Sequence, residues 1–464
     1  MDVLLINPPW EQLSEDVRAK AMVKNLTPSL GLGYIAAVLE RNGVVVQILD
    51  ANAEGISPAR LSQYLLQRGW QPKHIGITAT SHTIATALAM AIACKEALPT
   101  CAVTLGGVHP TVIPEETITC DAVDFVVRGE GEFSYLELVT GRKIEVIEGL
   151  SYKRDGCEFH NPPRARIADL DQLPFPAFHL MPVHKYHPTL GTYRQLPAMG
   201  VIGSRGCPFN CTYCASPAFW GRQVRVRSAG NILEEIALLV KDFGIREIQL
   251  LDDTFTVAKN RFKEFCALLS EAEFRITWSC NSRVDNVDDE LLKLMKATGC
   301  HSISYGIESA DEEMLKRIKK RISLDQARTA IALTKKHGIT CRASFMFGNP
   351  GETWETMQKS VQFALETMPD FVVFNIIRPY PGTEVYEWAC EMGGLMRKKW
   401  YMSPESGAIM RLPNLSRQDL VKAQREAMRR FYVRPHYAFS RISRMRSIAD
   451  IRMYLEGFVG ILRT

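Results

Sequence analysis

Short apolar runs rich in β-branched residues alternate with helical patterns through the first 140 residues. Apolar residues recur at helical spacing in the stretches 30–43 and 83–99, and Gly43 is a typical helix-ending residue. The runs predict five strands, at 2–9, 44–52, 74–81, 101–110 and 124–132. Strands that alternate with helices predict an α/β fold with a parallel, doubly wound, Rossmann-like sheet, which binds ligands beyond the carboxyl ends of its strands.

A second series of strand and helix patterns begins near residue 198. Its six apolar runs lie at 198–206, 247–253, 275–283, 301–309, 340–348 and 370–378, with amphipathic helical stretches between them. Six repeats are two short of a closed barrel, so they predict a partial (β/α)6 barrel of the TIM type with its site at the carboxyl ends of the strands. We therefore expect four segments: a first domain at 1–140, a linker at 141–197, the barrel at 198–390 and a helical extension at 391–464.

Composition restricts the class of protein. The chain has 464 residues, a hydrophobic content of 46% and a net charge of +5, which are ordinary values for a globular protein. We find no apolar run of about 18 residues, as a membrane-spanning helix needs, and no signal peptide at the start. These features predict a cytoplasmic protein with reduced thiols. Nine of the twelve cysteines are scattered singly, and we expect them to be small buried hydrophobic residues.

Unusual residues gather where the strands of the first sheet end. The four turns are Asn7-Pro8-Pro9, Thr80-Ser81-His82, Gly106-Gly107-Val108-His109-Pro110 and Gly129-Glu130-Gly131-Glu132. Paired glycines allow a large flat or phosphate-bearing ligand to approach the backbone closely, although glycine at a strand end is also ordinary turn chemistry. A histidine here is either a pocket residue or a polar group with a structural partner.

Three cysteines follow the first barrel strand within eight positions: Cys207, Cys211 and Cys214. A structural zinc site needs a fourth ligand, and no further Cys or His lies within reach of a short loop. A Cys-x-x-Cys redox pair leaves Cys207 without a role. An iron–sulfur cluster is normally held by four thiolates, so three of them would leave one iron open to a substrate or cofactor.

This cysteine spacing, after the first strand of a six-fold βα barrel, resembles the radical S-adenosylmethionine (SAM) superfamily, and the resemblance extends over most of residues 198–383. It implies a [4Fe-4S] cluster on the three cysteines and SAM on the open iron. It also implies a further motif at the end of each later strand. The implied SAM contacts are Tyr213 before the third cysteine, Asp252 and Asp253 where the family has Gly-Gly-Glu, Asn281 and Arg283 after the third strand, and Glu308 and Ser309 in "GIES".

The first domain resembles the cobalamin-binding domain at the amino terminus of many radical SAM enzymes, through "GGVHP" and the acidic "GEGE" turn. Domains of the methionine-synthase type carry a cobalt-ligating histidine after the first strand, whereas "NPPWEQL" has none here. We therefore expect no cobalt ligand from that loop. The resemblance implies cobalamin contacts at Pro8, Ser81, Gly106, Gly107, His109, Gly129 and Glu130.

The combined resemblance implies a cobalamin-dependent radical SAM enzyme. In the leading hypothesis it is a C-methyltransferase: a 5′-deoxyadenosyl radical abstracts hydrogen from an unactivated carbon, and methylcobalamin supplies the methyl group. The alternative is an anaerobic oxidative cyclase or ring-rearranging enzyme of the same architecture, acting on a tetrapyrrole, lipid or natural product. A methylthiolating enzyme would be expected to show an additional cluster-binding domain and usually a carboxy-terminal RNA-binding module, and we recognise no pattern for either. A non-catalytic cobalamin sensor would not need the cysteine loop.

The expected partners are a small-molecule substrate of apolar character and an external electron donor such as flavodoxin or ferredoxin, but no nucleic acid. The carboxy-terminal tail is basic and has apolar residues at helical spacing: Ile442, Met445, Ile448, Leu455, Phe458 and Leu462. We expect this helix to cover a barrel edge. Peripheral contact with an anionic membrane is the alternative.

Overall fold

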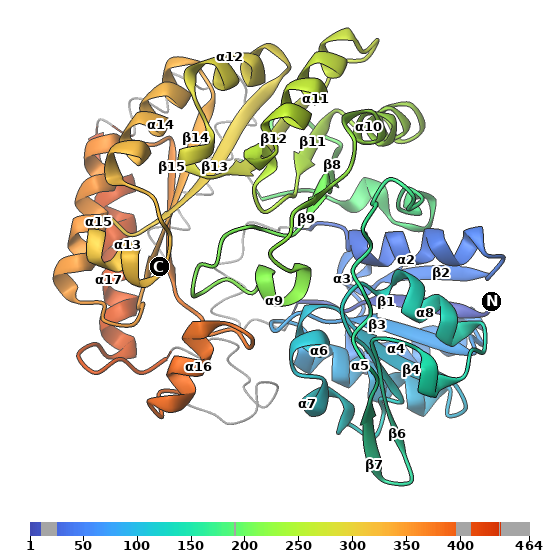
Figure 1. Ribbon diagram of the computed structural model, residues 1–464. Helices are drawn as coiled ribbons and strands as arrows, with labels where there is room; N and C mark the ends of the chain where they lie inside the picture. Colours follow the sequence, from blue (N-terminus) through green and yellow to red (C-terminus); the bar gives the residue numbers. More distant parts are fainter. Residues whose placement is uncertain (11–25, 190–191, 396–409, 436, 438–464) are drawn as a thin grey trace.

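A computed structural model describes residues 1–10, 26–189, 192–395, 410–435 and 437. It contains two α/β parts, each built on its own sheet (Figure 1). The first sheet has the order β2-β1-β3-β4-β5-β6-β7. Its first five strands are parallel, which confirms the expected doubly wound fold. They are β1 (Val3–Asn7), β2 (Val46–Asp50), β3 (His74–Thr78), β4 (Ala102–Gly106) and β5 (Phe125–Val127).

Two strands of the first sheet lie inside the segment expected to be a linker. Antiparallel β6 (Leu150–Arg154) and β7 (Cys157–His160) extend the sheet beyond β5. All four residues of β7 are exposed, so this strand lacks the hydrophobic alternation that marks a strand in sequence. Residues 141–197 are therefore only partly a connection.

Helices cover both faces of the first sheet because alternate strand residues point to opposite sides. Leu4 and Ile6 of β1 join a core with α4 (Pro58–Arg68) and α5 (Ile84–Ala97). Val3 and Leu5 face α2 (Leu30–Arg41) and α8 (Gly131–Val139). The apolar pattern thus specifies a three-layer arrangement.

The second sheet has six parallel strands in the order β15-β14-β13-β12-β11-β8, with β15 and β8 at its two edges. Each predicted barrel strand is confirmed, and helices α10 to α15 lie on the outside of the curved sheet (Figure 1). The strands are β8 (Ala198–Val201), β11 (Glu247–Leu250), β12 (Thr277–Ser282), β13 (Cys300–Glu308), β14 (Thr340–Phe347) and β15 (Phe371–Ile376). The main outer helices are α10 (Ala229–Phe243), α11 (Lys259–Glu271), α12 (Asp289–Ala297), α14 (Leu324–Lys336) and α15 (Trp354–Thr367).

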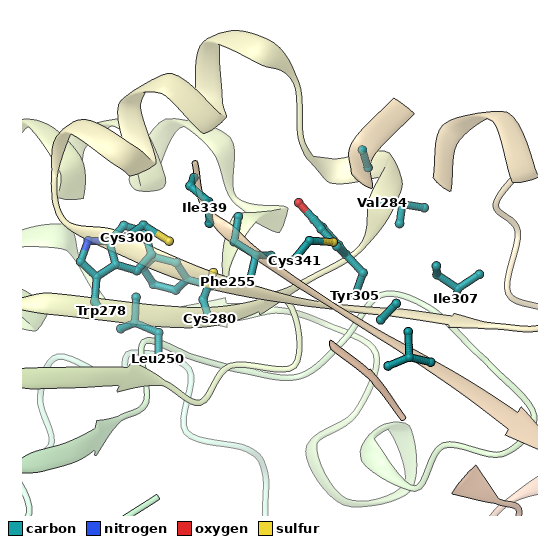
Figure 2. Close-up of a cluster of buried hydrophobic side chains, with 14 of the residues drawn as sticks. Leu250, Phe255, Trp278, Cys280, Val284, Cys300, Tyr305, Ile307, Ile339 and Cys341 are labelled. Carbon is teal, nitrogen blue, oxygen red and sulfur yellow. The ribbon is translucent and has the colours of Figure 1, made fainter. Parts of the chain in front are cut away.

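The barrel core lies between these strands and helices. Figure 2 shows Trp278, Phe255 and Tyr305 there, together with three cysteines that pack as apolar side chains: Cys280, Cys300 and Cys341. Six of the nine scattered cysteines are buried, as expected. Cys157 and Cys390 are instead exposed and Cys120 is partly buried, so the prediction of buried cysteines was wrong for these three.

The open edge at β15 is covered by α17 (Arg417–Tyr432). The Val372 N–H donates to the Tyr432 hydroxyl oxygen at 2.9 Å, and the Tyr432 hydroxyl lies 2.7 Å from the Val372 carbonyl. The Gln424 amide donates to the Phe374 carbonyl at 2.7 Å. These side chains occupy strand groups that would otherwise pair with another chain. The apolar tail residues beyond 437 lie outside the described residues, and no helix in the described part is both long and apolar enough to span a bilayer.

Helix α2 joins the two parts. Leu30, Tyr34 and Val38 on one side belong to the barrel core, whereas Leu32 and Ala36 belong to the core of the first sheet. Burial of apolar surface stabilises an interface by about 25 cal/mol per Å². A helix that is apolar on two sides therefore packs the two parts against each other.

Candidate functional site

The cysteine loop lies at the carboxyl ends of the barrel strands. Cys207, Cys211 and Cys214 all line one cleft of about 990 Å³, which we call the barrel cleft. The loop follows the short strand β9 (Ser204–Arg205) and leads into α9 (Ser216–Trp220). Gly206 has a φ of +99°, and a Cβ there would lie 2.2 Å from the Gln223 carbonyl oxygen. Only glycine fits this tight approach.

The chemistry of this donor set fits an iron–sulfur cluster. Thiolates are the usual ligands of such clusters, and each binds a different iron atom. No group of His, Cys, Asp and Glu side chains suited to a single metal ion occurs among the described residues. Burial raises the pKa of Cys207, and raises that of Cys214 to about 12. Both thiols therefore release a proton when they bind iron.

Five of the predicted SAM contacts line the barrel cleft with the cysteines. They are Tyr213, Asp253, Asn281, Arg283 and Glu308. The structure adds Lys320, whose ammonium donates to the Tyr213 hydroxyl at 3.2 Å and pairs with Glu308 at 3.3 Å. Burial raises the pKa of Tyr213 well above its usual value, so its hydroxyl stays protonated. One side of the cleft thus presents a cation, a carboxylate and a phenol to a zwitterionic ligand.

The backbone at Glu308 has an unusual conformation. Glu308 has a φ of +72° beside a register shift between β13 and β14. A Cβ at Gly306 would lie 2.2 Å from the Glu308 carboxylate and 3.0 Å from the Lys320 ammonium. Positive φ in a residue other than glycine costs free energy and is concentrated at functional sites. The "GIES" motif therefore positions the Glu308 carboxylate in the cleft.

Two predicted SAM contacts lie elsewhere. Asp252 is buried, accepts from the Gly203 N–H at 2.9 Å and from the Ser204 hydroxyl, and does not line the barrel cleft. Ser309 is buried, and its hydroxyl accepts from the Asp311 N–H at 3.2 Å. Asp252 therefore holds the strand that precedes the cysteine loop, and Asp253 is the acidic residue of "LLDD" that reaches the cleft.

Arg283 reaches the cleft, although its guanidinium already has partners. It pairs with Asp285 through two contacts of 2.9 Å and donates to the Lys320 carbonyl at 2.9 Å. It also stacks on the Phe209 ring at 3.6 Å, which fixes the middle of the cysteine loop. Sequence reasoning missed several lining residues: Phe209, Thr254, Ser282, Ser304, Tyr305, Lys320, Arg342, Ser344 and Asn375.

A second cleft, of about 770 Å³, opens at the carboxyl ends of the first sheet, and we call it the first cleft. Glycines make up much of its wall, namely Gly31, Gly76, Gly106, Gly107, Gly129 and Gly131. A Cβ at Gly76 would lie 2.8 Å from Leu5 and 3.0 Å from the Tyr135 hydroxyl. The Thr104 and Tyr135 hydroxyls are buried in this wall and have no hydrogen-bond partner in the described part of the chain. A glycine-lined cleft with unpartnered hydroxyls fits a bulky ligand that carries polar groups, as cobalamin does.

The predicted cobalamin contacts are divided between this wall and the turns around it. Gly106, Gly107, Gly129 and Glu130 line the first cleft, whereas Pro8, Ser81 and His109 do not. The His109 ring lies 3.1 Å from the Ser81 hydroxyl, and burial lowers the His109 pKa to about 4. These two residues therefore connect the turn after β3 with the turn after β4, outside the lining of the first cleft.

His82 is engaged in the same way. Its Nε2 lies 3.1 Å from the hydroxyl of Tyr380, which follows β15 in the barrel. Burial and the nearby Arg378 lower the His82 pKa to about 4. This contact joins a turn of the first sheet to a loop of the barrel.

One stretch of chain, residues 202–220, contributes to both clefts, and its three cysteines line the barrel cleft. Ile202, Arg205, Phe219 and Trp220 come from the barrel and line the first cleft, and Arg205 lies two residues before Cys207. Helix α9, which begins two residues after Cys214, lies between the barrel and α6 (Val108–Val112) of the first part (Figure 1). The cysteine loop and its flanks therefore contribute to both clefts.

Comparison with known proteins agrees with this arrangement. Residues 201–364 match the radical SAM superfamily model and residues 19–139 match the B12 binding domain model. An uncharacterized methyltransferase of Pyrococcus horikoshii is 35% identical over 94% of this chain and 93% of its own length. The anaerobic magnesium-protoporphyrin IX monomethyl ester cyclase of Rubrivivax gelatinosus is 28% identical over 93% of this chain and 78% of its own.

A solved structure shares the fold. The radical SAM methyltransferase TsrM from Kitasatospora setae, with cobalamin and a [4Fe-4S] cluster bound, superposes with a TM-score of 0.72 at 18% identity, covering 94% of this chain and 90% of its own. The order of the two α/β parts is therefore shared with TsrM.

Proposed function

The chain belongs to the cobalamin-dependent radical SAM enzymes, and from this premise we propose that it transfers a methyl group to an unactivated carbon of a small molecule. The observation that carries the proposal is that one stretch of chain, residues 202–220, contributes lining residues to both the barrel cleft and the first cleft. Methyl transfer needs the radical source and the methyl donor to reach the same substrate carbon, so it needs two clefts that lie next to each other.

When bound together, the cluster, SAM and cobalamin supply homolytic hydrogen abstraction and a transferable methyl group. For each substrate methylated, two SAM molecules and two electrons are consumed. One SAM yields methionine and 5′-deoxyadenosine, which has taken the substrate hydrogen. The other yields S-adenosylhomocysteine, and its methyl group replaces that hydrogen.

The residues of the barrel cleft would hold the cluster and SAM. Cys207, Cys211 and Cys214 are the proposed iron ligands. The Lys320 ammonium suits the SAM carboxylate, and the Glu308 and Asp253 carboxylates suit its amino and ribose hydroxyl groups. Tyr213, fixed by Lys320, presents its ring to the adenine. Each role follows from the charge and position of the side chain in one cleft.

The residues of the first cleft would hold cobalamin by shape and backbone contact. Gly106, Gly107 and Gly129 admit the ligand, and the Thr104 and Tyr135 hydroxyls offer it hydrogen bonds. Neither His109 nor His82 lines the first cleft, so we propose that no histidine of these turns ligates cobalt.

A further cavity in the barrel suggests where the substrate binds. It shares Asn281, Ser304 and Arg342 with the barrel cleft and continues past Gln249 and Ser279. This polar lining favours a small substrate with polar groups over a wholly apolar one. We propose that flavodoxin or ferredoxin supplies the electrons and that the protein is cytoplasmic.

The alternative function is oxidative cyclisation, and one observation favours it. The cyclase of Rubrivivax gelatinosus is similar to this chain over 93% of this chain's length, so the architecture alone does not separate the two reactions. Their nucleoside products do, because S-adenosylhomocysteine forms only when a methyl group leaves SAM.

The deciding experiment uses the anaerobically purified protein with cluster and cobalamin loaded. It is incubated with SAM and titanium(III) citrate, and both nucleosides are measured by mass spectrometry. We expect 5′-deoxyadenosine and S-adenosylhomocysteine together. 5′-Deoxyadenosine alone would favour the cyclase, and the absence of both would contradict either function.

A further inference from the structure

Arg205 ties the cysteine loop to the first part of the protein. Only Gly206 separates it from Cys207. Its guanidinium lies 2.7 Å from the Glu130 carboxylate and 2.6 Å from the Glu132 carboxylate. The three side chains are no more than 5% exposed. The ion pairs are therefore shielded from solvent and connect residues more than 70 positions apart.

Further contacts enclose this arginine. Its guanidinium lies 5.2 Å from the Tyr34 ring of α2 and 5.1 Å from the Trp220 ring of α9. Arg225 of β10 (Arg225–Val226) pairs with Glu130 at 2.8 Å, and its backbone is in register with Arg205. Two cations and two carboxylates thus form one buried cluster, which we call the Arg205 cluster: Arg205, Arg225, Glu130 and Glu132.

The Arg205 cluster lies in the wall of the first cleft. Arg205, Glu130 and Glu132 line that cleft, as do the two rings that enclose the guanidinium. A ligand that fills the cleft will therefore press on the side chains that hold Arg205. The same four residues link this wall to the loop that carries the cysteines.

The backbone beyond Arg205 has little freedom to absorb a displacement. The Gly206 turn lies against the Gln223 carbonyl, and the Cys207 N–H donates to the Gly221 carbonyl at 3.3 Å. A Cβ at Gly221 would in turn meet the Arg166 guanidinium at 2.6 Å. A change in the position of Arg205 is consequently passed on to Cys207.

We propose that the Arg205 cluster couples the two clefts, so that the iron–sulfur cluster and cobalamin each bind more tightly when the other is present. Arg205 is a positioning residue in this scheme, and the inference rests on the assignment of the two cofactors proposed above. Coupling of binding free energies is reciprocal, so either cofactor reports on it. Apolar packing would hold the two parts of the protein together equally well, because burial of an ion pair carries a large desolvation cost. The buried charges therefore point to a role other than holding the parts together.

The test compares hydroxocobalamin binding to the full chain with and without the reconstituted iron–sulfur cluster, by absorbance titration. For the wild type we expect the ratio of the two dissociation constants to be at least about fivefold, the lower end of typical couplings. Glu132→Gln removes one charge from the Arg205 cluster and should reduce the ratio to about 1. Arg205→Lys keeps the charge without the fork that holds both carboxylates, and should give an intermediate ratio.

Glu247→Gln is the matched control. Glu247 is buried, pairs with His301 at 2.5 Å at the amino end of the barrel strands, and does not line the first cleft. This variant should keep the wild-type ratio even if its melting temperature falls. If the Arg205 cluster were merely structural, Glu132→Gln would raise both dissociation constants by the same factor, and their ratio would not change.

A ratio of 1 in the wild type overturns the proposal without any variant, as does a wild-type ratio in folded Glu132→Gln or Arg205→Lys. Circular dichroism establishes which variants are folded. The outcome is independent of methyl transfer, because binding is measured without turnover. Loss of S-adenosylhomocysteine formation with an intact ratio would contradict the proposed function alone.

Discussion

The barrel cleft and the first cleft both receive residues from the stretch 202–220, but their linings differ in chemical character. The barrel cleft presents thiols, charges and a phenol, namely Cys207, Cys211, Cys214, Glu308, Lys320 and Tyr213. The first cleft presents glycines, apolar side chains and two unpartnered hydroxyls, and its charged residues Arg205, Glu130 and Glu132 are paired with one another. In the proposed assignment, the barrel cleft recognises its ligands by charge and metal ligation, whereas the first cleft recognises its ligand mainly by shape. Substitutions in the two clefts should therefore have different effects.

The largest expected effect is that of Cys211→Ala. Loss of one of three thiolates should abolish the cluster, and with it 5′-deoxyadenosine formation, to below detection. Hydroxocobalamin should still bind, as it should to the wild type without the iron–sulfur cluster, because the first cleft contains no thiol of this loop. Iron content, nucleoside analysis and absorbance titration measure these three quantities. Cys390→Ala, at an exposed cysteine of α16 (Glu384–Glu391), is the control and should resemble the wild type; 5′-deoxyadenosine from Cys211→Ala would refute the radical assignment.

The converse substitution fills the first cleft. Gly106 lines it, and a Cβ there would make only ordinary contacts, 3.5 Å from the Val127 carbonyl oxygen. Gly106→Ala should be tolerated, whereas Gly106→Leu should weaken cobalamin binding by about a hundredfold, equivalent to about 2.8 kcal/mol. SAM cleavage to 5′-deoxyadenosine should persist in both variants. If Leu and Ala bind cobalamin equally well, the ligand lies elsewhere.

The sequence alone predicts more of the lining residues in one cleft than in the other, and the chemical character of those residues explains why. The cysteine loop and Glu308 were predictable because a charged or metal-binding side chain has few other reasons to occupy a strand end. Lys320 was not, because it lies in a loop among other basic residues and only the fold brings it beside Glu308. In the first domain the predicted glycines Gly106, Gly107 and Gly129 line the first cleft. Glu130 was expected to contact cobalamin, but its carboxylate pairs with Arg205 and Arg225, which only long-range packing reveals.

All eleven parallel strands in the described part of the chain were predicted, because β-branched apolar runs between helices leave few alternatives. The hairpin of β6 and β7 was missed, because its exposed strand has no apolar pattern. Buried strands and residues with distinctive side-chain chemistry can thus be predicted from a sequence. Residues that act through partners distant in the sequence cannot.

A smaller effect separates two adjacent lysines of the barrel. The side chains of Lys320 and Glu308 are 8% and 12% exposed, whereas those of Lys319 and Glu384 are 40% and 55% exposed. Breaking a buried pair costs about 3–5 kcal/mol and a surface pair about 0–1 kcal/mol. Lys320→Met should raise the KM for SAM at least about tenfold, that is about 1.4 kcal/mol of binding. Lys319→Met should change it less than about twofold; equal effects would remove Lys320 from the SAM site.

The last prediction concerns the pH dependence of stability and leaves cofactor binding aside. Burial raises the pKa of Glu352, in the loop after β14, to about 7. The folded state therefore holds a proton that the unfolded state loses, so this stabilisation is present at low pH and disappears as pH rises through about 7. His82 and His109, with lowered pKa values of about 4, have the opposite sign and destabilise the first part as pH falls from about 6.5.

Glu352→Gln should therefore raise the melting temperature at about pH 8.5 and change it little at about pH 5.5, with a stability difference of about 2–3 kcal/mol. Glu355→Gln, an exposed neighbour on α15, is the control and should show no pH-dependent change. A Glu352→Gln melting temperature that parallels the wild type at both pH values would show that this carboxyl is ionised in the folded protein.

The most direct test of the account measures both nucleosides from one anaerobic preparation, loaded with the iron–sulfur cluster and assayed with and without cobalamin. Two clefts with separate ligands predict that 5′-deoxyadenosine forms in both assays, because it depends on the barrel cleft. S-Adenosylhomocysteine should form only when the first cleft is filled. S-Adenosylhomocysteine without cobalamin, or its absence with cobalamin bound, would contradict the account.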